Sequence, residues 1–209
     1  MTTATALGLQ VALRVNDASQ SAITAAQYLS FVNMAIDDLS AAGWLMPQSD
    51  DTSISLVSGT YNYTVPAGFA YIRHLHVADP DSNYPSSYEI PFVQWELAVT
   101  VVTLVDTPQI KFWPDAFDLL VNGRTIRIRG QKRPTGSLTG SETLALGMEA
   151  FIRERATAYA AEYLASGSDE LAQHRAQIAA SSWAKSQVML AYHPQEFRVK
   201  SNSRVVPGR

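Results

Sequence analysis

Apolar residues recur at three- and four-residue spacing across positions 24–42, the pattern of a helix with one buried face. The recurring residues are Tyr28, Phe31, Val32, Ala35 and Leu39. Thr24 followed by Gln27 has the form of an N-terminal capping box. Gly43 suits the left-handed position after a helix, with Trp44 folding back as in a Schellman ending. The pattern therefore predicts a first core helix here.

A second helical pattern begins near Ser141 and ends at Gly167. Its apolar stripe contains Leu144, Met148, Phe151, Ile152, Tyr159 and Tyr163. A further helix, capped by Ser168, runs to about Ala191, and the two helices are predicted to form an αα-hairpin. This last helix has small residues four apart: Ala172, Ala176, Ala180 and Ala184. Such a face suits close packing inside the subunit, which we favour, or against a neighbouring subunit.

Between the helical patterns, residues 53–132 consist of short β-prone runs separated by Pro, Gly, Asp and Asn, which is typical of a small antiparallel sheet. The predicted strands cover residues 54–57, 61–65, 71–78, 109–113, 119–121 and 125–129. Asn122-Gly123 suits a type I′ hairpin turn between the last two strands. Residues 79–85 are predicted to form a surface loop, whereas the apolar run 93–105 fits either a helix or a strand.

The predicted architecture is α+β: a helical core, made of an N-terminal helix plus a C-terminal αα-hairpin, with a β-rich insertion and an extended C-terminal tail. By residue number, 1–52 form the N-terminal segment and first core helix, and 53–140 the insertion. Residues 141–193 form the helical hairpin that completes the core, and 194–209 the tail. A length of 209 residues suits one packed domain with an elaboration.

Charge and composition limit the function classes. A net charge of −3 argues against sequence-specific DNA binding, which needs a surplus of Lys and Arg. Residues 194–209 carry four basic residues against one Glu, or +3, which leaves the rest of the chain at −6. The chain has no cysteine, so disulfides, thiolate metal sites and cysteine nucleophiles are excluded. Neither a signal peptide nor an eighteen-residue apolar run is evident, so we expect no membrane association.

Candidate catalytic and metal-binding residues are few. His74 and His76 lie two apart on a predicted strand and share one face, but a third metal ligand is not evident, and ordinary histidines are favoured. Carboxylate pairs occur at Asp115 and Asp118 and at Asp37 and Asp38. Solvent-facing charge explains them as well as acid–base chemistry does. Because the usual hydrolase, zinc, phosphate and dinucleotide motifs are missing from the sequence, we predict a non-catalytic protein with no cofactor and no bound metal.

One predicted strand has a basic and an apolar face, because Arg127 and Arg129 alternate with Ile126 and Ile128. Further basic residues extend its patch: Arg124, Lys132 and Arg133. The patch suits an acidic surface on a neighbouring subunit, or DNA in a channel. A channel that lets DNA slide must not bind phosphates strongly, so the neighbour contact is the preferred functional interpretation, and a solvated strand face is the alternative.

Two stretches resemble the head-to-tail adaptor (connector) proteins of tailed phages. Residues 28–39, in which Asn33 precedes Asp37 and Asp38, are similar to the opening helix of that family. In residues 126–164 a basic strand ends in Lys132-Arg133-Pro134 and is followed by a polar loop and a long helix rich in Arg, Glu, Ala and Tyr. The resemblance in layout covers most of the chain.

The resemblance implies a structural subunit of the virion neck, assembled in the host cytoplasm. Copies of it, usually twelve, would form a homo-oligomeric ring docked on the portal protein. Packaged double-stranded DNA would pass through the ring without sequence-specific binding, and the next neck or tail protein would bind its other side. Another neck or tail-completion protein is the alternative, and a nucleic-acid-binding or metal-dependent enzyme is less favoured.

By position, the resemblance assigns portal contact to residues 197–206. The docking residues would be Phe197, Arg198, Val199, Lys200, Arg204, Val205 and Val206. This segment has too little apolar mass to fold alone, so we expect it to order against a partner. Its apolar side chains would fill pockets or add an edge strand, with the cations on acidic portal surface. A terminus without a role is the alternative.

Overall fold

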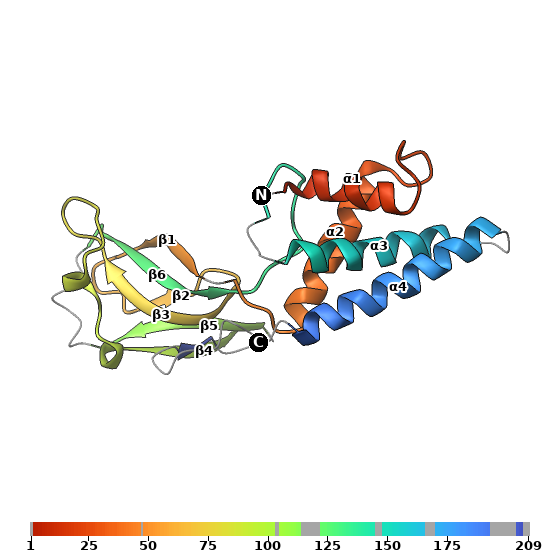
Figure 1. The fold of residues 1–209 in the computed structure, drawn as a ribbon. Helices are drawn as coiled ribbons and strands as arrows, with labels where there is room; N and C mark the ends of the chain where they lie inside the picture. The colour runs from red at the N-terminus through yellow and green to blue at the C-terminus, as the bar shows by residue number, and fades with distance from the viewer. Residues whose placement is uncertain are drawn as a thin grey trace. The chain divides into compact units, whose positions relative to one another are not determined.

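The computed structural model describes residues 2–46, 48–102, 105–113, 122–144, 148–165, 170–192 and 204–206. The chain divides into two compact units. The helical unit comprises Met1–Trp44 and Pro134–Glu196, and the β unit comprises Leu45–Arg133 and Phe197–Arg209 (Figure 1). The fold is therefore mixed α+β, as predicted, and a β unit does interrupt a helical core. Of the expected C-terminal tail, the described residues Arg204 to Val206 belong to the β unit.

The helical unit is built around its third helix. Its helices are α1 (Ala4–Arg14), α2 (Ala25–Ala41), α3 (Glu149–Leu164) and α4 (Glu170–Tyr192). Helix α3 packs against each of the other three (Figure 1). It is therefore covered nearly all round, and even Glu154, Arg155 and Thr157 are buried. Helices α3 and α4 form the predicted hairpin.

Helix α1 was not predicted, and the expectation of a single N-terminal helix is wrong. Thr3 caps the helix, its hydroxyl accepting a hydrogen bond from the Ala6 amide at 3.2 Å. The buried residues Leu7, Val11 and Val15 are spaced four apart, which is a helical signal. The helix is short and has exposed leucines on its other side, so its apolar pattern is not confined to one face.

Helix α2 begins and ends as its sequence predicts. Thr24 and Gln27 form the capping box, with both reciprocal hydrogen bonds present. At the other end Gly43 has a φ of 84°, and the Trp44 amide donates to the Leu39 carbonyl at 3.2 Å. Both features define the predicted Schellman ending.

The second helical pattern starts later than expected, at Glu149 instead of near Ser141. Thr143 forms an isolated antiparallel bridge with Thr3 at the start of α1, and the Leu144 amide donates to the Thr2 carbonyl at 3.0 Å. In α4, Ala172 is buried, but Ala176, Ala180 and Ala184 are exposed. The expectation that this alanine face packs inside the subunit is therefore wrong for three of its four residues.

The β unit has two antiparallel sheets (Figure 1). The strands are β1 (Ser49–Ser55), β2 (Asn62–Thr64), β3 (Phe69–Val77), β4 (Trp95–Val102), β5 (Val105–Phe112), β6 (Thr125–Lys132) and β7 (Arg204–Val205). One sheet has the order β1-β6-β3-β7 and the other β2-β5-β4. Two short 3-10 helices, η1 (Ser86–Tyr88) and η2 (Phe92–Gln94), lie between β3 and β4.

Most predicted strands are present, and the ambiguous run 93–105 contains a strand, β4. The predicted strand 119–121 lies outside the described residues; of the turn that follows it, Gly123 has a φ of 80°. Both sheets contribute to one hydrophobic core, for example Leu75 of β3, Ile110 of β5 and Ile126 of β6. Burial of this shared core is what holds the two sheets together.

A bulge in β3 decides which side chains face outward. The pairing register with β6 shifts between Ile72 and His74, so Ile72 and Leu75 both point into the core although they are three residues apart. Gly130 pairs with Ile72 at this point. After the bulge, His74 and His76 lie on the outer face of the sheet beside the arginines of β6.

Candidate interaction sites

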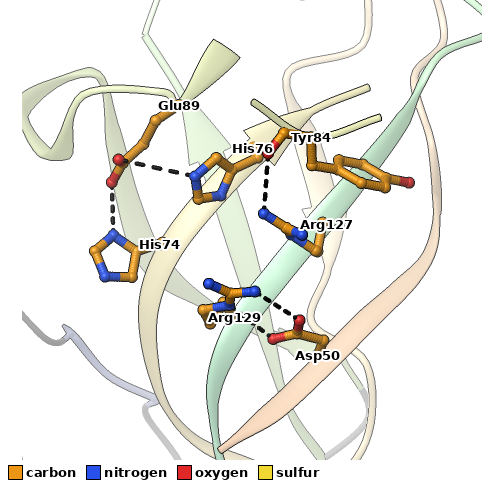
Figure 2. Close-up of polar contacts among 7 residues, drawn as sticks. All are labelled: Asp50, His74, His76, Tyr84, Glu89, Arg127 and Arg129. Atoms are coloured by element: carbon orange, nitrogen blue, oxygen red, sulfur yellow. Dashed lines mark hydrogen bonds and ion pairs between the residues drawn. The ribbon is translucent and has the colours of Figure 1, made fainter. Parts of the chain in front are cut away.

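The outer face of the four-stranded sheet carries a cluster of charged residues from neighbouring strands (Figure 2). Asp50 of β1 and His74 of β3 both pair in register with Arg129 of β6. His76 pairs with Arg127 two residues away. Because side chains of directly paired residues share a face, the ladder itself brings these groups together.

The two arginines of the cluster are bound within the β unit (Figure 2). Arg129 donates from Nε and Nη2 to the two carboxylate oxygens of Asp50, at 3.0 and 3.1 Å. Arg127 donates from Nη2 to the Tyr84 carbonyl at 3.1 Å and lies 4.9 Å from the centroid of the Tyr84 ring. Their cationic groups are therefore neutralised or capped locally.

Glu89 lies between the two histidines (Figure 2). Its Oε1 is 2.6 Å from His74 Nδ1, and its Oε2 is 3.8 Å from His76 Nε2. Within the described part of the chain, no group of three or more potential ligand residues is arranged to hold a metal ion. The arrangement is a hydrogen-bonded polar cluster on a sheet face.

The environment of His76 keeps its ring neutral. Burial lowers the pKa of His76 below its ordinary value of 6.5, and the positive charge of Arg127 lowers it further. Glu89 opposes this shift only in part. The neutral ring adds no charge to the cluster at neutral pH.

The rest of the predicted basic patch is also occupied, with Arg133 as the exception. Arg124 Nη1 donates to the Ala78 carbonyl at 3.4 Å. Lys132 Nζ donates to Asp51 at 3.0 Å and lies 4.5 Å from the Phe69 ring centroid. For Arg133 the only described hydrogen bond is through its backbone amide, to the Gly68 carbonyl. The strand has the predicted basic and apolar faces, but most of its cations have partners within the β unit.

The end of the predicted docking segment lies on the chain's own sheet. Val205 pairs with Tyr71 and Arg204 with Ile72, which makes β7 the neighbour of β3. The Val206 amide donates to the Ala70 carbonyl at 2.8 Å, and the Val206 side chain, 2% exposed, is part of the core. Phe197, Arg198, Val199 and Lys200 lie outside the described residues.

Arg204 is held between aromatic rings. Its guanidinium carbon is 4.3 Å from the Phe92 ring centroid and 4.5 Å from that of Trp95. Its Nη2 also donates to the Phe92 carbonyl. Two aromatic faces and a carbonyl form a binding site for one cation at the edge of the β unit.

In the helical unit, the polar residues that carry the family resemblance hold the loop over residues 134–144. Asn33 accepts a hydrogen bond from the Leu138 amide and donates one to the Leu138 carbonyl, both at 3.1 Å. One turn later, Asp37 accepts from the Gly136 amide at 2.8 Å. A Cβ at Gly136 would lie 2.2 Å from the Asn33 carbonyl oxygen, so the loop approaches α2 as closely as glycine allows.

Asp38 connects α2 to α3. It accepts a hydrogen bond from the Tyr159 hydroxyl at 2.5 Å and lies 3.3 Å from Arg155 Nε. The Arg155 guanidinium lies 4.1 Å from the ring centroid of Trp183 on α4. Burial and the hydrogen bond to Asp38 raise the pKa of Tyr159 to about 12. The pair Asp37 and Asp38 thus serves packing, which accounts for it without acid–base chemistry.

A protein-family model described as SU10 adaptor protein matches residues 1–189. The chain belongs to this family. Because it is a phage head-to-tail adaptor family, the resemblance drawn from the α2 and α3 motifs is confirmed. No curated protein matches the chain.

Membership makes this SU10-type adaptor a bacteriophage virion protein of the neck, where the portal meets neck or tail proteins. Adaptors of this family are structural, which agrees with the prediction of a non-catalytic protein. No described helix is long and apolar enough to cross a membrane. The match includes α1, α2, α3 and all but the last three residues of α4, and it ends before the C-terminal segment. The docking role of that segment therefore rests on other arguments.

Proposed function

We propose that this adaptor forms a ring docked on the portal, extends the DNA channel and offers a platform to the next neck or tail protein. The observation that carries the proposal is the match to a head-to-tail adaptor family over residues 1–189. Twelve copies, assembled in the host cytoplasm, would complete the ring. The packaged double-stranded DNA would pass through it.

A ring requires two different complementary faces on each subunit. The helical unit has exposed apolar side chains of two kinds: large ones on α1, Leu9 and Leu13, and the small alanine face of α4 with Val188 nearby. A stable contact between neighbours buries on the order of 1,600 Å². Exposed apolar residues on two separate helices support a contact that is heterologous and not self-matching.

The seven docking residues of the C-terminal segment are proposed to contact the portal. Residues 194–209 carry a net charge of +3, while the rest of the chain carries −6. The segment is therefore suited to an acidic surface on a partner protein. Arg204 and Val205 pair with the edge of β3, and Val206 is buried in the core. This arrangement supports the proposal that the segment binds sheet edges that have an apolar pocket.

Weak interaction with DNA suits a conduit. The net charge is negative, and Arg127 and Arg129 already have partners in the β unit. A channel wall of this kind repels or tolerates DNA and does not bind its phosphates strongly. Of the predicted basic patch, Arg133 is the residue we propose for contact with a neighbouring subunit.

The experiment is co-sedimentation of the purified adaptor with rings of the cognate portal, followed by imaging of the bound particles. The unmodified adaptor is expected to bind and to add a ring-shaped layer. A variant with Phe197, Arg198, Val199 and Lys200 all changed to Ala is expected to lose binding at least tenfold. This variant leaves Arg204, Val205 and Val206 unchanged, so β7 and the buried Val206 keep their side chains.

A matched control carries the same number of alanine substitutions at exposed polar positions of the β unit: Ser58, Thr60, Ser86 and Ser87. It tests whether any change of this size weakens the complex. An adaptor that never binds portal rings but binds another neck protein would be a tail-completion protein, the alternative function.

A further inference from the structure

Three residues of the proposed docking segment bind to the subunit's own β unit. Arg204 and Val205 form β7 on the edge of β3, and Val206 fills a position in the hydrophobic core. Arg204 is also stacked on Phe92 and Trp95. The β unit therefore holds the segment by backbone pairing, an apolar pocket and a cation site together.

We infer that the portal and the edge of β3 compete for Arg204, Val205 and Val206, so that portal docking requires release of β7. This inference rests on the proposed function, and it adds how the docking site is regulated. The contact with β3 is small, with two residue pairs in register, so its release leaves the other six strands paired. A segment that is available only part of the time binds a partner more weakly, in proportion to the available fraction.

The same contacts indicate what the portal must offer. A partner that takes the segment has to replace the pairing lost from Tyr71 and Ile72, the apolar pocket of Val206 and the site of Arg204. An exposed strand edge with an apolar pocket, next to an acidic or aromatic side chain, meets all three needs. The portal surface is therefore expected to accept β7 as an added strand.

A reversible covalent lock tests the inference. Val205 is paired directly with Tyr71, and the hydrogen bond from the Val206 amide to the Ala70 carbonyl makes this a non-hydrogen-bonded pair. In such pairs the Cα atoms are about 4.5 Å apart, within disulfide range. The chain has no cysteine, so Tyr71→Cys with Val205→Cys forms one defined bridge. The single variants, which cannot form this bridge, are the controls.

Oxidation of the double variant is expected to weaken portal binding at least tenfold, and a reductant is expected to restore it. Each single variant is expected to bind portal equally well with oxidant and with reductant, because neither can form the bridge. Equal binding by the oxidised and reduced double variant would overturn the inference and leave the portal-docked ring standing. Failure of the reduced variant and of the unmodified protein to bind portal would overturn the proposed function itself.

A second variant moves the equilibrium the other way. Phe92→Ala removes one ring from the Arg204 site without changing any residue of the docking segment. A cation–π contact of ordinary strength corresponds to about two- to fivefold in population. Portal binding is therefore expected to tighten by up to about this factor. Unchanged or weaker binding would contradict competition between the two sites.

Discussion

Gly130 illustrates how one residue controls the alignment of the sheet. It lies opposite the bulge in β3, where a Cβ would be 2.1 Å from the Tyr71 carbonyl oxygen and 3.1 Å from the Ile72 Cα. No side chain fits there without moving the backbone of β3. The bulge in turn places His74 and His76 outward, so the position of the polar cluster depends on this glycine.

Gly130→Ala is expected to lower the free energy of unfolding of the β unit by about 2–4 kcal/mol, because the strands must separate to admit the methyl group. Chemical denaturation followed by circular dichroism measures this. Gly59→Ala is the matched control: Gly59 has a φ of 75° but nothing within 4 Å, so only conformational strain of about 1 kcal/mol applies. Equal losses for the two variants would disprove the close-approach argument.

His76 makes the stability of the β unit depend on pH. Burial and then Arg127 lower its pKa in the folded state below 6.5, the ordinary value, so below that pH the unfolded chain binds more protons. The contribution to stability is thus fully present above pH 6.5 and is lost as pH falls below it. His76→Gln should flatten this part of the profile when thermal unfolding is compared at pH 7.5 and 5.5. An unchanged slope would mean that other groups carry the dependence.

At the scale of elements, the sequence predicted what depends on neighbours along the chain. Both ends of α2, the hairpin of α3 with α4 and the strands of the β unit follow from local periodicity and capping. The late start of α3 could not be predicted from local periodicity. Residues 134–144 are held instead by Asn33 and Asp37, which are distant in sequence. The alternating Arg127 and Arg129 were recognised, but their partners Tyr84 and Asp50 come from other strands.

Asn33→Ala tests the attachment of this loop to α2. The variant loses two hydrogen bonds and leaves the Leu138 amide and carbonyl without their partner, so we expect a loss of about 1–3 kcal/mol in the helical unit. Hydrogen exchange of residues 134–144 should rise while the β unit is unaffected. Ser30→Ala, on the exposed side of the same helix, is the control and should change little. Similar effects of both substitutions would refute the anchoring role of Asn33.

At the scale of the molecule, the order of helical and β segments was predictable, but the seat of the C-terminal residues was not. The composition of residues 194–209 predicted a segment that orders against a partner, either filling pockets or adding an edge strand. The edge strand with which Arg204 and Val205 pair is β3, which lies more than 120 residues before them in the sequence. Two residue pairs and one buried valine leave no periodic signal in a sequence. Residues 204–206 are therefore both part of the β unit and part of the proposed contact with the portal.

Two adjacent valines separate these two roles. Val206 is 2% exposed in the core, whereas Val205, the last residue of β7, is 59% exposed. Val206→Ala is therefore expected to cost the β unit about 1–3 kcal/mol and Val205→Ala less than about 0.5 kcal/mol. Hydrogen exchange of β3 should rise in the first variant alone, while α3 stays protected in both. If Val206→Ala left β3 as protected as Val205→Ala does, Val206 would not be seated in the core in solution. An effect of Val206→Ala on portal binding can therefore be assigned to docking only after hydrogen exchange of β3 has shown how far the substitution loosens β7.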